Sequence, residues 1–126
     1  MNHTGKELQL MLEKKKPLSM FYDEPAEEGQ LSLIPEEEFD KFVDNCLFIK
    51  GSKIYELAFD PRQGQNLQVK YVLYALRIEE WRIPAMFLTL DIMFSLRKYD
   101  EGIDRMIGAL LGYTNAELDE FVAKRK

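Results

Sequence analysis

The most continuous apolar pattern in the sequence lies between residues 84 and 98. On a helical wheel, apolar side chains occupy nearly every side of this segment, and the exception is a narrow polar stripe of Asp91, Ser95 and Lys98. A helix that is apolar around most of its circumference is typically buried. Pro84 suits the first helical position, where no N–H donor is needed. The pattern therefore predicts a helix over 84–98 at the centre of the core.

Two further helices are predicted after this segment. Asp100 is placed to cap the first of them, in which apolar residues recur at helical spacing, and Gly112 is placed to end it. Thr114 and Glu117 have the spacing of a capping box, in which each side chain bonds the other residue's backbone N–H. The sequence therefore predicts a helical hairpin at the end of the chain.

The N-terminal half contains two more helix signals. Thr4 and Glu7 form a second capping-box pair in front of a helix predicted over 5–16. A helix over 35–44 begins with Pro35 and has three glutamates in its first turn, where the helix dipole favours negative charge. Both helices are therefore predicted from signals at their first turns.

Strands are predicted where short apolar runs are bounded by turn residues. One run is 18–22, and residues 31–34 fit either a second strand or the entry to the next helix. The runs 46–50 and 53–59 flank a Gly-Ser pair at 51–52, which is the signal for a tight hairpin. These runs predict a small, mainly antiparallel sheet.

The segment 67–81 fits two patterns. Its apolar residues fit one face of a helix, and they fit one face of a strand equally well. The run is long for a strand, so a helix is predicted. The sequence thus predicts a single α+β domain over 1–126, in which three or four short strands pack against five or six helices and the C-terminal half is all helical.

Charge is unevenly distributed along the 126 residues, whose net charge is −5. Residues 23–44 contain nine acidic residues and one lysine. An acidic domain repels phosphate backbones, so nucleic-acid binding is disfavoured and a basic protein partner is favoured. An alternative reading is that these acids only keep a small domain soluble.

The N-terminus lacks the long apolar region of a signal peptide, and no run approaches the roughly 18 uninterrupted apolar residues of a membrane span. The sequence therefore predicts a cytoplasmic protein that does not enter a membrane, with leaderless export left open. Cys46 is the only cysteine, which excludes an intramolecular disulfide. The oligomeric state is left open.

No catalytic constellation is present in the sequence. His3 is the only histidine and lies near a chain end, which is expected to fray. Nucleophile-elbow, phosphate-loop and metal-ligand spacings are absent, so no enzyme activity, metal or cofactor is predicted. The alternative is a small-molecule-binding or hydrolytic domain that uses carboxylates such as Asp91 and Glu101.

The sequence therefore predicts a protein-interaction domain that binds or inhibits a basic partner, as bacterial toxin-immunity proteins and phage-encoded inhibitors do. A helix-turn-helix DNA-binding regulator is a third reading of the C-terminal hairpin, but the acidic start of its last helix opposes it. Aromatic and arginine side chains are enriched at interface hot spots. Trp81 and Arg82 are therefore added to the acidic residues as candidates for partner binding. The candidate partner-binding residues are Tyr22, Asp23, Glu24, Glu27, Glu28, Glu36, Glu37, Trp81 and Arg82.

Overall fold

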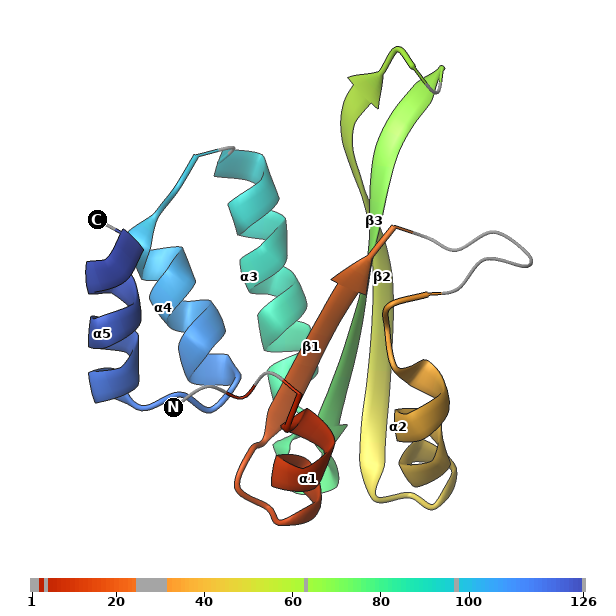
Figure 1. The fold of residues 1–126 in the computed structure, drawn as a ribbon, viewed down its shortest axis with the longest axis vertical. Coiled ribbons are helices and arrows are strands. Elements are labelled where there is room, and N and C mark those ends of the chain that lie inside the picture. The colour runs from red at the N-terminus through yellow and green to blue at the C-terminus, as the bar shows by residue number, and fades with distance from the viewer. Residues whose placement is uncertain (1–2, 4, 25–31, 63, 97, 126) are drawn as a thin grey trace.

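The computed structural model describes residues 3, 5–24, 32–62, 64–96 and 98–125 (Figure 1). These residues form a mixed α+β fold, as the sequence predicted. The strands are β1 (Leu18–Asp23), β2 (Phe48–Asp60) and β3 (Gln65–Leu76). The helices are α1 (Glu7–Leu12), α2 (Glu36–Asp44), α3 (Arg82–Leu96), α4 (Glu101–Leu110) and α5 (Asn115–Arg125), with a short 3-10 helix η1 (Arg77–Glu79).

The three strands form one antiparallel sheet in the order β1-β3-β2. Helices cover both of its faces: α1 and α2 lie on one face, α3 lies on the other, and α4 and α5 form an outer layer beside α3 (Figure 1). The prediction of a small antiparallel sheet is confirmed. Two of the strands are much longer than predicted, with 13 residues in β2 and 12 in β3.

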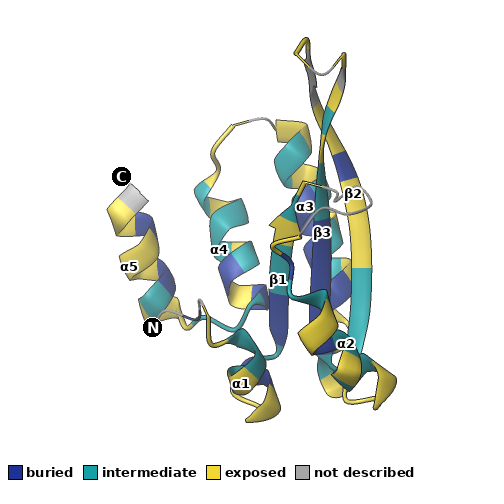
Figure 2. Cartoon of the chain, turned by 45° about the vertical axis from the view of Figure 1, so that its right-hand side comes forward, coloured by how far each residue is buried: buried dark blue, intermediate teal, exposed yellow. Residues whose placement is uncertain are grey.

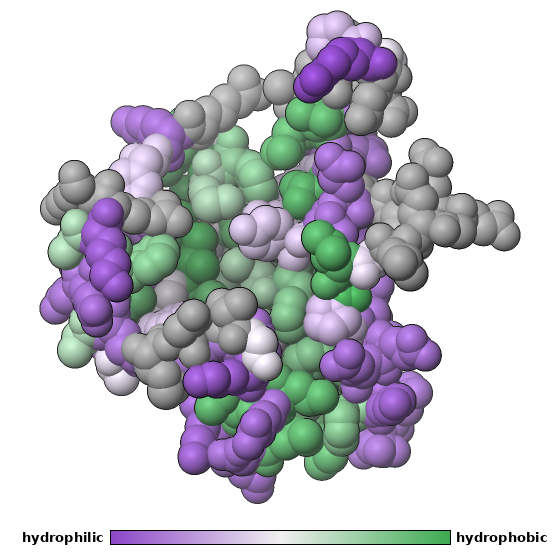
Figure 3. Space-filling model, viewed as in Figure 1, coloured by the Kyte–Doolittle hydropathy of each residue, from purple (hydrophilic) through white to green (hydrophobic). Residues whose placement is uncertain are grey.

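The central strand β3 separates two apolar cores. Tyr71, Leu73 and Ala75 point towards α3, whereas Val72 and Tyr74 point towards α1 and α2, and all five are buried. Figure 2 shows the buried part of β3 in dark blue. In Figure 3, apolar residues gather between the sheet and the outer helices, which is the side of the α3 core. A strand buried on both faces shows no alternation of polar and apolar residues. The helix predicted over 67–81 is therefore wrong.

The turn predicted at residues 51–52 is also wrong, because β2 runs through it without interruption. A Cβ added to Gly51 would lie 2.6 Å from Cγ2 of Ile83 and 3.1 Å from the ring of Phe87. Gly51 therefore lets α3 approach the sheet closely, and it does not mark a hairpin. The hairpin is instead formed by β2 and β3, which end and begin at Asp60 and Gln65, and Gly64 just before β3 has φ +68°.

The predicted helices of the second half are confirmed, with adjusted ends. Asp100 Oδ1 accepts a hydrogen bond from the backbone N–H of Ile103 at 3.0 Å, so it caps α4. Thr114 and Glu117 form the reciprocal capping box, with bonds of 2.9 and 3.2 Å. Helix α3 begins at Arg82, before the predicted proline, and ends at Leu96. The prediction of an all-helical C-terminal half is wrong, because β3 extends to Leu76 and the chain is helical only after it.

In the first half, α2 lies where it was predicted, and α1 is shorter than predicted. Helix α1 ends at Leu12, and Lys14 has φ +61°, which no continuing helix adopts. Residues 32–34 form no strand. Of the two predictions for 31–34, the entry to α2 therefore fits the residues that the structure describes. Cys46 has φ +63° and is exposed, so it lies in the turn after α2 and not in a strand.

Replacing Gly112 by alanine is expected to destabilise the protein by about 2 kcal/mol, because two costs combine at this position. Gly112 has φ +97°, which is unfavourable for a residue with a Cβ, and an added Cβ would lie 2.6 Å from Cδ of Pro17. Urea unfolding of Gly112→Ala measures the loss. Gly64→Ala is the control, since Gly64 has φ +68° with no atom within 4 Å of an added Cβ. An equal loss in both variants would show that the contact with Pro17 contributes nothing.

Candidate functional site

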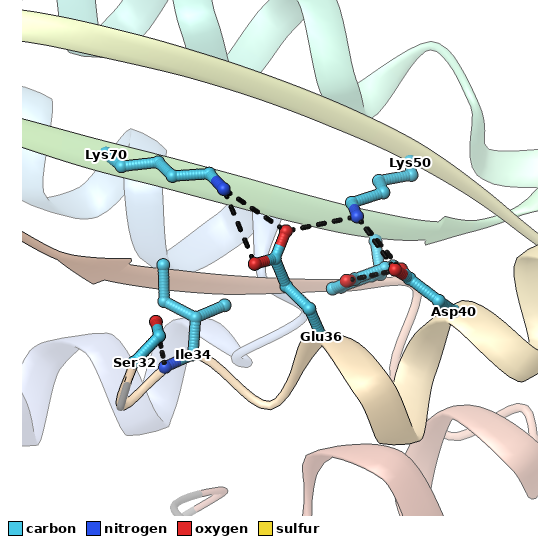
Figure 4. Close-up of polar contacts among 7 residues, drawn as sticks. Ser32, Ile34, Glu36, Asp40, Lys50 and Lys70 are labelled. Carbon is cyan, nitrogen blue, oxygen red and sulfur yellow. Dashed lines mark hydrogen bonds and ion pairs between the residues drawn. The ribbon is translucent and has the colours of Figure 1, made fainter. Parts of the chain in front are cut away.

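Part of the predicted acidic surface is neutralised by two lysines of the sheet (Figure 4). Glu36 at the start of α2 accepts hydrogen bonds from Lys50 at 3.1 Å and Lys70 at 3.3 Å. Asp40, one turn later, accepts from Lys50 at 3.0 Å and from the hydroxyl of Tyr74 at 2.8 Å. These contacts raise the pKa of Lys50 despite its partial burial. Glu36 therefore anchors α2 to the sheet and is not available as a docking charge.

Of the other predicted acidic residues, one binds the local backbone and two are exposed to solvent. Asp23 accepts hydrogen bonds from the backbone N–H groups of Glu24 at 2.8 Å and Leu33 at 2.9 Å, so its carboxylate is used by the local backbone. Glu24 and Glu37 are exposed. The predicted residues Glu27 and Glu28 lie outside the described residues. The acidic surface that the structure describes is therefore smaller than the sequence suggested.

The predicted aromatic residue Tyr22 lies on the opposite face of the sheet from α2. Tyr22 pairs with Tyr71 across β1 and β3, and their rings stack with centroids 5.1 Å apart. Tyr71 belongs to the core beneath α3, and the side chain of Tyr22 is 61% exposed. The sheet thus separates Tyr22 from Glu36 and Glu37 of α2, with which it was grouped.

Trp81 and Arg82 are at the start of α3. The guanidinium of Arg82 lies 4.7 Å from the centroid of the Trp81 ring and donates to Glu79 at 2.8 Å. Arg82 also donates to the backbone carbonyls of Ala109 and Leu110 at 3.1 and 3.0 Å, which places a cation at the negative end of α4. Arg82 therefore fastens α3 to α4, while Trp81 remains 57% exposed.

An apolar surface continues from Trp81 along the outer side of α3. Leu88, Ile92 and Leu96 are 63%, 41% and 40% exposed, and their spacing of four residues keeps them on one side of the helix. On the opposite side, Met86 and Leu90 are completely buried against the sheet. We refer to Trp81, Leu88, Ile92 and Leu96 as the α3 ridge.

The α3 ridge corrects the expectation that this helix is enclosed by the rest of the chain. Its sequence is apolar all round, yet the residues that the structure describes cover only its sheet side and its α4 side. Contiguous apolar surface of this kind marks interaction sites. The sequence contained the signal, because Leu88, Ile92 and Leu96 follow helical spacing, but a single sequence does not distinguish an open apolar side from a covered one.

Asp91 lies next to the ridge and binds two residues of β2. Lys53 Nζ donates to Asp91 Oδ1 at 2.8 Å, and the hydroxyl of Tyr55 donates to the same oxygen at 2.7 Å. These two donors lower the pKa of Asp91. Burial, followed by the bond to Asp91, raises the pKa of Tyr55. Asp91 is therefore an ionised acceptor that is 43% exposed.

An open depression of about 620 Å³ adjoins this group. It is lined by Lys53, Ile54, Tyr55, Glu56, Asp91, Phe94 and Ser95. Glu101, which the sequence paired with Asp91 as a carboxylate candidate, is not among the lining residues and instead pairs with Arg105 on α4 at 3.4 Å. The two carboxylates therefore do not form a common site.

A buried polar cluster near the N-terminus was missed by sequence reasoning. His3 is only 3% exposed and stacks on Tyr113 with ring centroids 4.0 Å apart. Lys16, also 3% exposed, lies with Nζ 2.9 Å from Nδ1 of His3 and donates to the carbonyl of Leu111 at 3.0 Å. Burial lowers the pKa of Lys16 to about 8 and, together with the nearby lysine, lowers that of His3. His3 is therefore packed, contrary to the expectation that it lies in a frayed end.

The sequence matches no protein-family model, and no curated protein or solved structure is significantly similar to the chain. Among the described residues, no three His, Cys, Asp or Glu side chains are grouped closely enough to hold a metal ion. None of the helices described is both long enough and apolar enough to cross a membrane.

Proposed function

We propose that this protein is a protein-interaction domain that binds a basic partner protein, in the manner of toxin-immunity proteins and phage-encoded inhibitors, and that the partner docks on the α3 ridge. The observation that carries this proposal is the exposed apolar side of α3. Four large apolar side chains are each at least 40% exposed: Trp81 immediately before α3, and Leu88, Ile92 and Leu96 on it. Clusters of this composition supply the anchors of protein interfaces.

The negative charge of this protein favours a basic partner, because opposite charges speed association. The net charge is −5. Glu37, Glu38 and Asp44 are exposed on α2, which lies across the sheet from the α3 ridge. A partner docked on the ridge would not touch these carboxylates, but their field still attracts a basic protein during diffusion. The ridge would then determine the lifetime of the complex, and the acids would determine how fast it forms.

The surroundings of Asp91 argue against one hydrolytic role, that of a general acid. General-acid catalysis needs a carboxyl group that holds its proton near neutral pH, but both neighbours of Asp91 stabilise the ionised form. The adjoining depression is open to solvent. The helix-turn-helix reading is also disfavoured, because α5 has Glu117, Asp119 and Glu120 in its first turns, where a recognition helix contacts the DNA.

Two double variants separate these contributions. Leu88→Asp with Ile92→Asp is expected to weaken partner binding roughly 100-fold or more, mainly through faster dissociation, because hot-spot residues contribute most of the binding energy. Glu37→Gln with Glu38→Gln is expected to slow association several-fold at low salt and to leave dissociation unchanged. The partner is captured on the immobilised protein, identified by mass spectrometry, and then measured by surface plasmon resonance.

The control for the ridge variant is Leu12→Asp with Leu33→Asp. These two leucines are 44% and 85% exposed and lie on α1 and before α2, away from the ridge. The control introduces the same charge and is expected to leave dissociation unchanged. If the ridge variant and the control dissociate at the same rate, the partner does not dock on the ridge. If the captured partner is acidic, the charge part of the proposal is wrong.

A further inference from the structure

The outer edge of β2 is long and open. Within the part of the chain that the structure describes, β3 is the strand paired with β2, and it pairs on one side only. Strand β2 extends over 13 residues, whereas the other edge strand, β1, extends over 6. The pairing of β2 with β3 is regular up to Glu56, and a register shift follows. A regular open edge of this kind is a template for another strand.

The residues near the middle of β2 are self-complementary when two copies run antiparallel. In such a pair, a two-fold axis through Ile54 places Ile54 opposite its own copy, Lys53 opposite Tyr55, and Ser52 opposite Glu56. Ile54 is 50% exposed, so its contact with the second Ile54 would remove apolar surface from water. This register lies entirely within the regular part of the strand.

The neighbouring registers are less favourable. A two-fold axis through Lys53 would place two lysines opposite each other, which is destabilising. An axis through Tyr55 would pair Ile54 with Glu56 and would extend into the irregular part of the strand after Glu56. The axis through Ile54 avoids both problems, so the sequence of the strand favours one register.

The charge pattern beside the edge also fits this register. Within one chain, Lys53 Nζ already lies 4.9 Å from the centroid of the Tyr55 ring and 2.8 Å from Asp91 Oδ1. In the two-fold arrangement each Lys53 faces the Tyr55 of the other copy, next to that copy's Asp91. Two lysines and two aspartates would therefore alternate across the axis, beside the open depression of each copy.

We propose that β2 pairs with β2 of a second copy of this chain, antiparallel and centred on Ile54, to form a continuous six-stranded sheet. This inference goes beyond the proposed function, because it concerns the strand edge and not the α3 ridge. The occupant is a second copy because the same five residues, 52–56, supply both complementary halves of the contact. The two β3 strands and the two β1 strands then lie outward on either side of the paired β2 strands.

Sedimentation velocity over a concentration series tests the pairing. Wild type is expected to form dimers, and Ile54→Asp is expected to remain monomeric, because two carboxylates would face each other on the axis. Ile78→Asp, at a residue that is 87% exposed on η1, is the matched control and is expected to dimerise like wild type. A wild type that is monomeric throughout the series, or an Ile54→Asp variant that dimerises as well as wild type, would overturn the proposal.

Cross-linking tests the register without relying on the stability of Ile54→Asp. In a Cys46→Ser background, Ile54→Cys is expected to form an intermolecular disulfide under mild oxidation, because residues directly opposite in antiparallel strands have Cα atoms about 4.5–5.5 Å apart. Ile78→Cys is the control for random collisions, since Ile78 is more exposed than Ile54. If the Ile54→Cys variant cross-links no faster than the Ile78→Cys variant, the proposed register is contradicted.

Discussion

Replacing Phe39 by alanine is expected to lower the free energy of unfolding by about 3–5 kcal/mol, the usual cost of deleting a buried phenylalanine. Phe39 is 2% exposed and is the buried residue of α2. Its ring lies 4.7 Å from Tyr74, 5.1 Å from Phe21 and 6.1 Å from Phe48, measured between centroids. It therefore joins α2 to all three strands of the sheet.

The loss in Phe39→Ala would be a large fraction of the total free energy of unfolding, which is only about 5–15 kcal/mol for small domains. Urea unfolding followed by circular dichroism measures it. Phe121→Ala is the matched control, since Phe121 is 48% exposed on α5 and its loss is expected to cost about 1 kcal/mol or less. If Phe39→Ala cost no more than the control, the face of the sheet beneath α2 would not be a closely packed core.

The elements that the sequence predicted well are those with local signals. Asp100, Thr114 and Glu117 act within three residues of their hydrogen-bond partners, so their sequence spacing alone identified the starts of α4 and α5. The three glutamates in the first turn of α2 are also a local signal, through the helix dipole and without a side-chain capping bond. Signals of this kind need no knowledge of the tertiary fold.

Strand β3 could not be identified by the same reasoning. Its burial on both faces depends on α1 and α2 lying on one side and α3 on the other, which is a property of the whole fold. The Gly-Ser pair was misread for a similar reason. Gly51 is explained by the approach of Ile83, which lies 32 residues later in the chain, and nothing next to Gly51 in the sequence indicates that contact.

The candidate site was only partly predictable. Charge identified Glu36, but its two lysine partners lie on β2 and β3, so its anchoring role became visible only in the fold. Asp91 was singled out because it is an acid on an otherwise apolar helix, but its contacts with Lys53 and Tyr55, which stabilise its ionised form, became visible only in the fold. The α3 ridge and the open edge of β2 depend on what the rest of the chain leaves uncovered, which no local pattern records.

The contribution of Lys16 to stability is expected to increase by about 2–3 kcal/mol between neutral pH and about pH 10. Lys16 is 3% exposed, and burial lowers its pKa from 10.5 to about 8, although Glu7 and Glu117 oppose this shift. Between these two values the unfolded chain binds more protons at this residue than the folded chain. The folded state is therefore stabilised as pH rises through about 8, and the gain levels off above 10.5.

The lysine should be compared with Lys16→Met, which fills a similar volume and does not titrate. The difference in the free energy of unfolding between wild type and this variant isolates Lys16, because the raised pKa values of tyrosines such as Tyr55 and Tyr74 affect both proteins. We expect the methionine variant to be at least as stable as wild type at neutral pH, since it avoids a buried charge. The free energy of unfolding of wild type should increase relative to that of Lys16→Met as pH rises.

The packing around Lys16 provides the physical reason for the expected effect. The ammonium is enclosed by the ring of Tyr113 at 5.4 Å, Nδ1 of His3 and the carbonyl of Leu111, which offer dipoles and a π face, and the charges of Glu7 and Glu117 do not offset the cost of burial. A neutral amine keeps the same hydrogen bonds without the cost of a desolvated charge. If the difference between the two proteins stayed constant across this pH range, Lys16 would be hydrated in the folded state and the N-terminal cluster would not be packed as described.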